Sequence, residues 1–144
     1  MAYDFSELTV LIVEDSADMR RMLQELIQEF GVREVITAPE GETALDKMRD
    51  NDVDLVFCDW RMRPMDGLEF TRQVRQGSAG VDCFVPIIML TGYTNRDNVI
   101  AARDSGITEF LAKPVTTKAL YARLVAVIEK PRKFIRTRFF MGPC

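Results

Sequence analysis

A chain of 144 residues with 47% hydrophobic and 28% charged residues and a net charge of −3 has the composition of one soluble globular domain. No apolar run approaches the roughly 20 residues that cross a bilayer, and the acidic start lacks a signal-type apolar stretch, so we expect a cytoplasmic protein. The absence of histidine excludes Ser-His-Asp triads and histidine-containing zinc sites, and three widely spaced cysteines argue against a disulfide scaffold.

The first predicted elements are a buried strand and an amphipathic helix. Residues 8–13 form an almost continuous apolar run, which is typical of a strand buried on both faces of a parallel sheet. From Met19 to Phe30, apolar residues recur at spacings of three and one, and Gly31 suits the end of a helix. Polar residues between them, including Arg20 and Arg21, are expected to face water.

The same unit of strand and helix then repeats in weaker form along the chain. The further predicted strands cover residues 34–37, 53–58, 85–90 and 108–112, and the further predicted helices cover residues 41–49, 68–75, 95–104 and 116–129. Five strands alternating with five helices through short links predict an α/β fold, a doubly wound parallel sheet with helices on both faces. We assign this domain to residues 1–130.

Polar residues follow four of the strands, at the edge where open α/β sheets place their sites. Glu14 and Asp15 follow the first strand, Asp59 the third, Thr91 the fourth and Lys113 the fifth. Three crowded carboxylates repel one another unless a divalent cation lies among them, and oxygen ligands favour Mg²⁺ or a similar ion such as Mn²⁺. Asp59 is then suited to attack a phosphoryl group as a carboxylate nucleophile, with charge compensation from Lys113 and Thr91.

The loop after the first strand excludes two rival kinds of phosphate site. A flavodoxin-type or dinucleotide site needs a turn rich in Gly, Ser or Thr, so that backbone N–H groups can contact the phosphate. Residues 14–18 instead read Glu-Asp-Ser-Ala-Asp, which would repel a bare phosphate, and a P-loop is absent for the same reason.

Together, these residues resemble the signature of the receiver domain of two-component response regulators (CheY-like). The matching features are the Glu14-Asp15 pair, Asp59 with the loop that follows it to residue 68, Thr91, and Lys113-Pro114. The resemblance covers residues 8–129. It implies a flavodoxin-like sheet with strand order 2-1-3-4-5.

The resemblance also implies roles for the acidic residues. Asp59 would accept a phosphoryl group from a phosphohistidine of a sensor histidine kinase or phosphotransfer protein. Asp59 would also bind Mg²⁺, together with Glu14, Asp15 and the backbone carbonyl of Arg61.

The remaining implied roles concern the phosphoryl group and the response to it. Thr91 and Lys113 would contact the phosphoryl group, and Thr91 would act with Phe110, which occupies the aromatic switch position. The peptide bond between Lys113 and Pro114 would be cis.

Two departures from the family pattern carry further expectations. Arg63 stands where the family more often has the proline of the loop, so we expect the path of this loop to differ. Arg61 and Tyr93, each two residues beyond a site residue, are bulky. We predict that they hinder attacking water and prolong the phosphorylated state.

The predicted function is a phosphorylatable signalling switch, not an enzyme, with at most slow self-dephosphorylation. We expect a kinase to dock near the first helix and a target near the last two helices and fifth strand. We expect no nucleic acid and no membrane insertion, and a monomer or a phosphorylation-dependent dimer. Chemotaxis, phosphorelay and kinase feedback all stay open as pathways.

Three alternatives remain. Instead of a single-domain switch, the chain would be a phosphorylation-independent adaptor, the receiver part of a longer regulator, or a Mg²⁺-dependent phosphatase or dehalogenase. The last would need a second acid two residues after Asp59, where Arg61 stands. Residues 131–144, a basic and aromatic tail with a net charge of +4, are expected to pack on the domain or to fray rather than to bind a partner.

Overall fold

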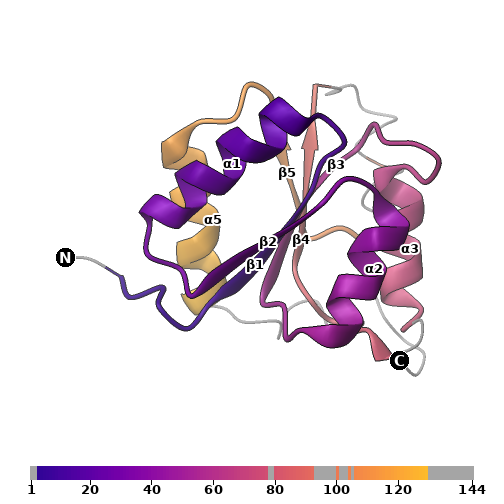
Figure 1. Ribbon diagram of the computed structural model, residues 1–144, viewed down its shortest axis with the longest axis horizontal. Helices are drawn as coiled ribbons and strands as arrows, with labels where there is room; N and C mark the ends of the chain where they lie inside the picture. Colours follow the sequence, from indigo (N-terminus) through magenta and orange to yellow (C-terminus); the bar gives the residue numbers. More distant parts are fainter. Residues whose placement is uncertain (1–2, 78–79, 93–99, 101–103, 105, 130–144) are drawn as a thin grey trace.

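The computed structural model describes residues 3–77, 80–92, 100, 104 and 106–129 (Figure 1). Five parallel strands form one sheet in the order β2-β1-β3-β4-β5, which confirms the expected fold and strand order. The strands are β1 (Thr9–Val13), β2 (Glu34–Ala38), β3 (Leu55–Asp59), β4 (Ile87–Thr91) and β5 (Glu109–Ala112).

Helices cover both faces of this sheet. In Figure 1, α1 (Ala17–Glu29) and α5 (Thr117–Glu129) lie on one side, and α2 (Gly41–Asp50) and α3 (Gly67–Arg75) lie on the other. The helix predicted over residues 95–104 falls almost entirely outside the described residues. Helices of 9 to 13 residues are too short to span a bilayer, and the described part of the chain contains no candidate membrane span.

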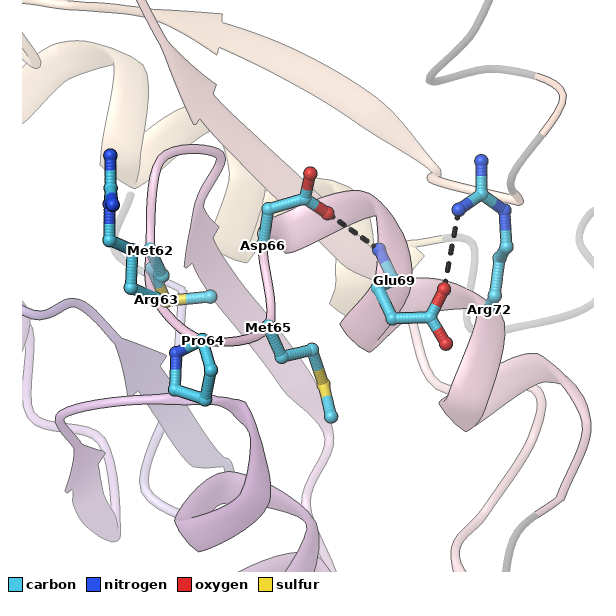
Figure 2. Close-up of a pocket in the computed structure, with 7 residues that line it drawn as sticks. All are labelled: Met62, Arg63, Pro64, Met65, Asp66, Glu69 and Arg72. Carbon is cyan, nitrogen blue, oxygen red and sulfur yellow. Dashed lines mark hydrogen bonds and ion pairs between the residues drawn. The ribbon is translucent and has the colours of Figure 1, made fainter.

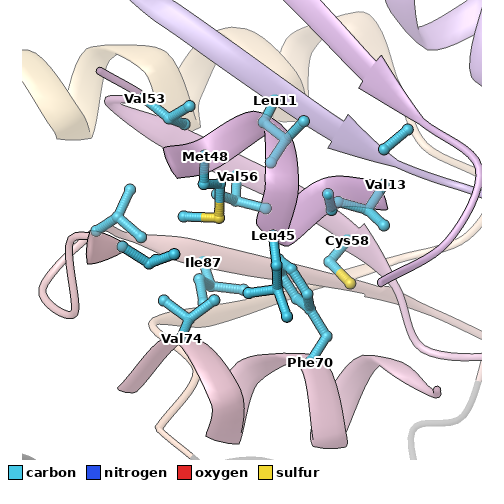
Figure 3. Packing of buried hydrophobic residues seen from close by; sticks show 14 of the residues in the cluster. Leu11, Val13, Leu45, Met48, Val53, Val56, Cys58, Phe70, Val74 and Ile87 are labelled. Atoms are coloured by element: carbon cyan, nitrogen blue, oxygen red, sulfur yellow. The ribbon is translucent and has the colours of Figure 1, made fainter. Parts of the chain in front are cut away.

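The three central strands explain the continuous apolar runs of the sequence. Every residue of β1, β3 and β4 is buried, because each of these strands has helices on both faces. Alternate side chains divide between two cores: Leu11 and Val56 pack toward α2 and α3 (Figure 3), and Ile12 and Phe57 pack toward α1 and α5. The sheet therefore lies between two apolar layers.

Two cysteines lie within the described part of the chain. Cys58 is a buried free cysteine at the end of β3. Cys83, which precedes β4, is also buried.

Candidate functional site

The register of the parallel strands gathers the predicted site residues at one edge of the sheet. Asp59 pairs with Leu90, and Thr91 pairs with Ala112 in the neighbouring strand. The backbone N–H of Lys113 then donates to the Thr91 carbonyl at 3.0 Å. The residues that end β3, β4 and β5 therefore lie side by side.

Three carboxylates converge at this edge. Glu14, Asp15 and Asp59 each offer one oxygen, and these oxygens all lie within 4.8 Å of one another. Glu14 and Asp59 are buried, with only 2% and 5% of their surface exposed, whereas Asp15 is exposed. Two buried acids so close together require compensating positive charge.

Lys113 supplies part of that charge. Its Nζ lies 2.7 Å from Asp59 Oδ1 and 3.7 Å from Glu14 Oε1. Partial burial by itself lowers the pKa of Lys113, but the hydrogen bond with Asp59 and the charges of Asp59 and Glu14 outweigh burial and raise it. Lys113 is therefore protonated at neutral pH and bridges the two buried acids.

One oxygen of Glu14 shows that the site suits a further cation. Oε2 accepts a hydrogen bond from the Ser16 N–H at 3.1 Å, whereas Oε1 is buried without a hydrogen-bond partner. Burial, followed by the neighbouring acids, raises the pKa of Glu14 against the opposing effects of the Ser16 N–H and Lys113. A small divalent ion among the three carboxylates would coordinate such an oxygen and offset the charge, so these residues fit Mg²⁺.

An open pocket of about 280 Å³ leads to the acidic cluster. Asp59 and Lys113 line it together with the exposed Arg61 and the buried Thr91. The predicted nucleophile, cation and hydroxyl thus share one solvent-accessible space. Tyr93, predicted to flank this site with Arg61, lies outside the described residues.

Phe110, the predicted switch residue, lies half-buried on β5 and stacks against Trp60. No sequence pattern indicated this stack. The Lys113–Pro114 peptide bond is cis, which confirms that expectation, and the Arg63–Pro64 bond is cis as well.

The loop between β3 and α3 lines a second, larger pocket, of about 820 Å³. Figure 2 shows its residues, from Met62 to Arg72, none of which belongs to the acidic cluster. Asp66 begins α3 by accepting a hydrogen bond from the Glu69 N–H at 2.9 Å, and Glu69 pairs with Arg72 at 3.4 Å. These contacts stabilise the helix that follows the site.

Arg20, which was predicted to face water, lies close to the site. Arg20 on α1 turns back, and its Nη1 donates to the backbone carbonyl of Glu14 at 2.7 Å. The expectation that Arg20 faces water is therefore wrong. Its long side chain reaches the loop from one turn inside the helix.

Comparisons with known proteins agree with this geometry. The sequence matches the response regulator receiver domain family over residues 10–125. Chemotaxis protein CheY of Pseudomonas aeruginosa is 29% identical over 123 residues, which are 85% of this chain and 98% of the relative.

Solved structures show the same likeness. Chemotaxis protein CheY4 of Vibrio cholerae has a TM-score of 0.77 and 35% identity, over 84% of this chain and 98% of that one. The receiver domain of a sensor histidine kinase from P. aeruginosa has a TM-score of 0.76 and 26% identity, over 86% and 99% of the two chains. In that structure a magnesium ion is coordinated in the active-site cleft.

Proposed function

The chain belongs to the response regulator receiver domain family, and we propose that it is a switch in which Asp59 accepts a phosphoryl group. The donor would be a phosphohistidine of a sensor histidine kinase or phosphotransfer protein. The observation that carries this proposal is the position of Asp59, 2.7 Å from the Lys113 ammonium and within a cluster of three carboxylates at the end of an open pocket.

In this proposal, Glu14, Asp15, Asp59 and the backbone carbonyl of Arg61 hold Mg²⁺ or Mn²⁺. When bound, the ion would offset negative charge on the phosphoryl oxygens. Glu14 Oε1 supports this assignment, because it is buried and accepts no hydrogen bond, and Lys113 reaches it only as an ion pair at 3.7 Å.

The transfer itself requires Asp59 to act as the nucleophile. One oxygen of its carboxylate forms a bond to phosphorus while the bond between phosphorus and the donor imidazole breaks. Lys113, which contacts Asp59 before the reaction, then donates to a phosphoryl oxygen. Thr91, at the end of the neighbouring strand, presents its hydroxyl to another.

The phosphoryl group would then shift the equilibrium between two conformations. Movement of Thr91 toward the phosphoryl group would release space beside Phe110 on β5, and thereby alter the face that includes β5 and α5. We propose that a protein target binds this face in the cytoplasm. The protein would have no enzymatic turnover beyond slow self-dephosphorylation. It would act as a monomer or a phosphorylation-dependent dimer.

Intact-mass spectrometry tests the proposal. After incubation with acetyl phosphate and Mg²⁺, the wild-type chain and an Asp52→Asn control should gain about 80 Da, the mass of one phosphoryl group, and Asp59→Asn should gain none. Labelling of Asp59→Asn would reject Asp59 as the acceptor. Partner binding without any labelling would favour an adaptor, and steady turnover of phosphate monoesters would favour an enzyme.

A further inference from the structure

Arg20 contacts the loop that carries two of the three clustered acids. The helix α1 starts after Ser16, which caps it by accepting a hydrogen bond from the Met19 N–H at 3.3 Å. The backbone N–H of Arg20 donates to the Ser16 carbonyl at 2.9 Å, so the residue is fixed in the first turn. From there its half-buried side chain reaches the Glu14 carbonyl at 2.7 Å.

This carbonyl belongs to the peptide unit that joins Glu14 to Asp15. Because a peptide unit is planar, a hydrogen bond to its oxygen restricts the rotation of the whole plane. The two side chains that branch from either end of this plane are the first two acids of the cluster. Arg20 therefore orients both through a single contact.

Two other hydrogen bonds hold this loop, but neither involves the peptide unit between Glu14 and Asp15. The Glu14 N–H donates to the Ala38 carbonyl at 3.0 Å, and the Ser16 N–H donates to Glu14 Oε2 at 3.1 Å. Both bonds fix atoms on either side of the peptide unit between Glu14 and Asp15. The guanidinium fixes the unit itself.

We propose that Arg20 is a positioning residue that sets the affinity of the acidic cluster for a divalent cation, an inference that rests on the proposed function. It does not touch the ion. It holds the backbone between Glu14 and Asp15 in the orientation in which their carboxylates converge with that of Asp59.

The positive charge of Arg20 acts in the opposite direction, because it repels a cation. Dissolved salt screens this repulsion across a solvated loop but leaves the geometry imposed by a hydrogen bond unchanged. Removal of the guanidinium should therefore weaken cation binding, because the lost positioning has a larger effect on affinity than the lost repulsion. The effect should be clearest at high ionic strength.

Arg21 offers a matched control. It is the next residue of the same helix, carries the same charge, and is exposed. Among the described residues, its side chain makes no hydrogen bond or ion pair within the chain. Arg21→Met thus removes one positive charge from α1 without removing the contact with the loop, and Arg20→Met removes both.

The experiment is a titration of each purified chain with MgCl₂ in buffered KCl. Binding is measured by calorimetry and by the fluorescence of Trp60, the single tryptophan. Arg20→Met should weaken Mg²⁺ binding about tenfold, as loss of a residue that orients metal ligands commonly does. Arg21→Met should stay within about twofold of wild type. Arg20→Lys, which keeps the charge and one donor, should lie between wild type and Arg20→Met.

The outcomes separate three cases. Equal affinities for Arg20→Met and Arg21→Met, or tighter binding by Arg20→Met, would overturn the role of Arg20. A wild-type chain that binds no Mg²⁺ would instead overturn the metal site of the proposed function. Thermal unfolding in EDTA checks that each variant folds. If Arg20→Met does not fold, Arg20→Lys is compared with Arg21→Lys. Weaker Mg²⁺ binding by Arg20→Lys would then support the proposal, and equal Mg²⁺ binding would reject it.

Discussion

Trp60 and Phe110 stack with their ring centroids 6.1 Å apart and their planes inclined by 27°. Trp60 directly follows Asp59 at the end of β3, and Phe110 lies on β5, two strands away in the sheet. Both rings pack against the small apolar cluster of Met89 and Ile107, and Met89 belongs to β4, the strand between β3 and β5. The residue next to the proposed phosphoacceptor thus touches the proposed switch residue directly.

This stack should be measurable as an energetic coupling. In a double-mutant cycle of Trp60→Leu and Phe110→Leu, we expect the two losses of unfolding free energy in urea to be non-additive by about 1 kcal/mol, the usual size for an aromatic pair. Tyr121 packs against the core on the α1 and α5 side. In a control cycle of Trp60→Leu and Tyr121→Leu, the two losses of unfolding free energy should therefore be additive. Additive losses for Trp60 and Phe110 would contradict the coupling.

Arg61 should prolong the phosphorylated state. Its exposed side chain lines the pocket beside Asp59 and Thr91, along the route that attacking water would take. We expect Arg61→Ala to lose its phosphoryl group several times faster than wild type, as followed by intact mass after removal of acetyl phosphate. Arg63→Ala, an exposed residue of the same loop that lines the other pocket, should decay at the wild-type rate. An unchanged or slower rate for Arg61→Ala would reject this role.

Glu14 should destabilise the protein when no metal is present. Because burial is the main cause that raises the pKa of Glu14, its charged form is unfavourable in the folded chain. The neutral variant Glu14→Gln should therefore melt about 3 °C higher in EDTA, equivalent to roughly 1 kcal/mol, and respond less to Mg²⁺. Asp15→Asn should lose the Mg²⁺ response without the gain in EDTA, since Asp15 is exposed. A lower melting temperature of Glu14→Gln in EDTA would contradict this.

Arg75 should be a major source of stability. It is only 6% exposed, and its guanidinium donates to three backbone carbonyls at 2.7 to 3.1 Å, those of Gly106, Cys83 and Val85. Burial lowers the pKa of Arg75 to about 10, so it stays charged at pH 7. Arg75→Met would leave these acceptors unpaired and should cost about 3 kcal/mol in urea unfolding. Arg72→Met, on the exposed side of the same helix, should cost far less.

Glu40 should make α2 sensitive to acid. Its carboxylate accepts hydrogen bonds from the Glu42 N–H and from the N–H and hydroxyl of Thr43, at 2.8 to 3.1 Å. These bonds lower the pKa of Glu40 from 4.5, and the bond from the Glu42 N–H has the largest effect. Since the folded-state pKa is the lower one, the stabilisation is present above pH 4.5 and is lost as the pH falls through the folded-state pKa.

The test compares wild type with Glu40→Gln. The variant should be less stable by about 0.5 kcal/mol at pH 7, and the difference should shrink as the pH is lowered. Glu25→Gln, on the exposed surface of α1, is the control and should leave the free energy of unfolding at pH 7 almost unchanged. A difference between wild type and Glu40→Gln that persists at low pH would show that the charge is not the cause.

The sequence by itself determined the architecture and the chemical character of the site. Strands buried on both faces have to be apolar at every position, so β1, β3 and β4 are visible as continuous runs. Parallel strands end at one edge, so Asp59 and Thr91 could be placed together from their positions alone. Both are consequences of local patterns along the chain.

Only the tertiary structure decided which long side chains turn toward the site and the core. Arg20 and Arg75 bind backbone carbonyls, and Trp60 meets Phe110 across a strand. A carbonyl is present at every residue and therefore leaves no mark in the sequence that would identify it as a partner. A long side chain has several rotamers of similar energy, and the packing of the folded chain selects among them.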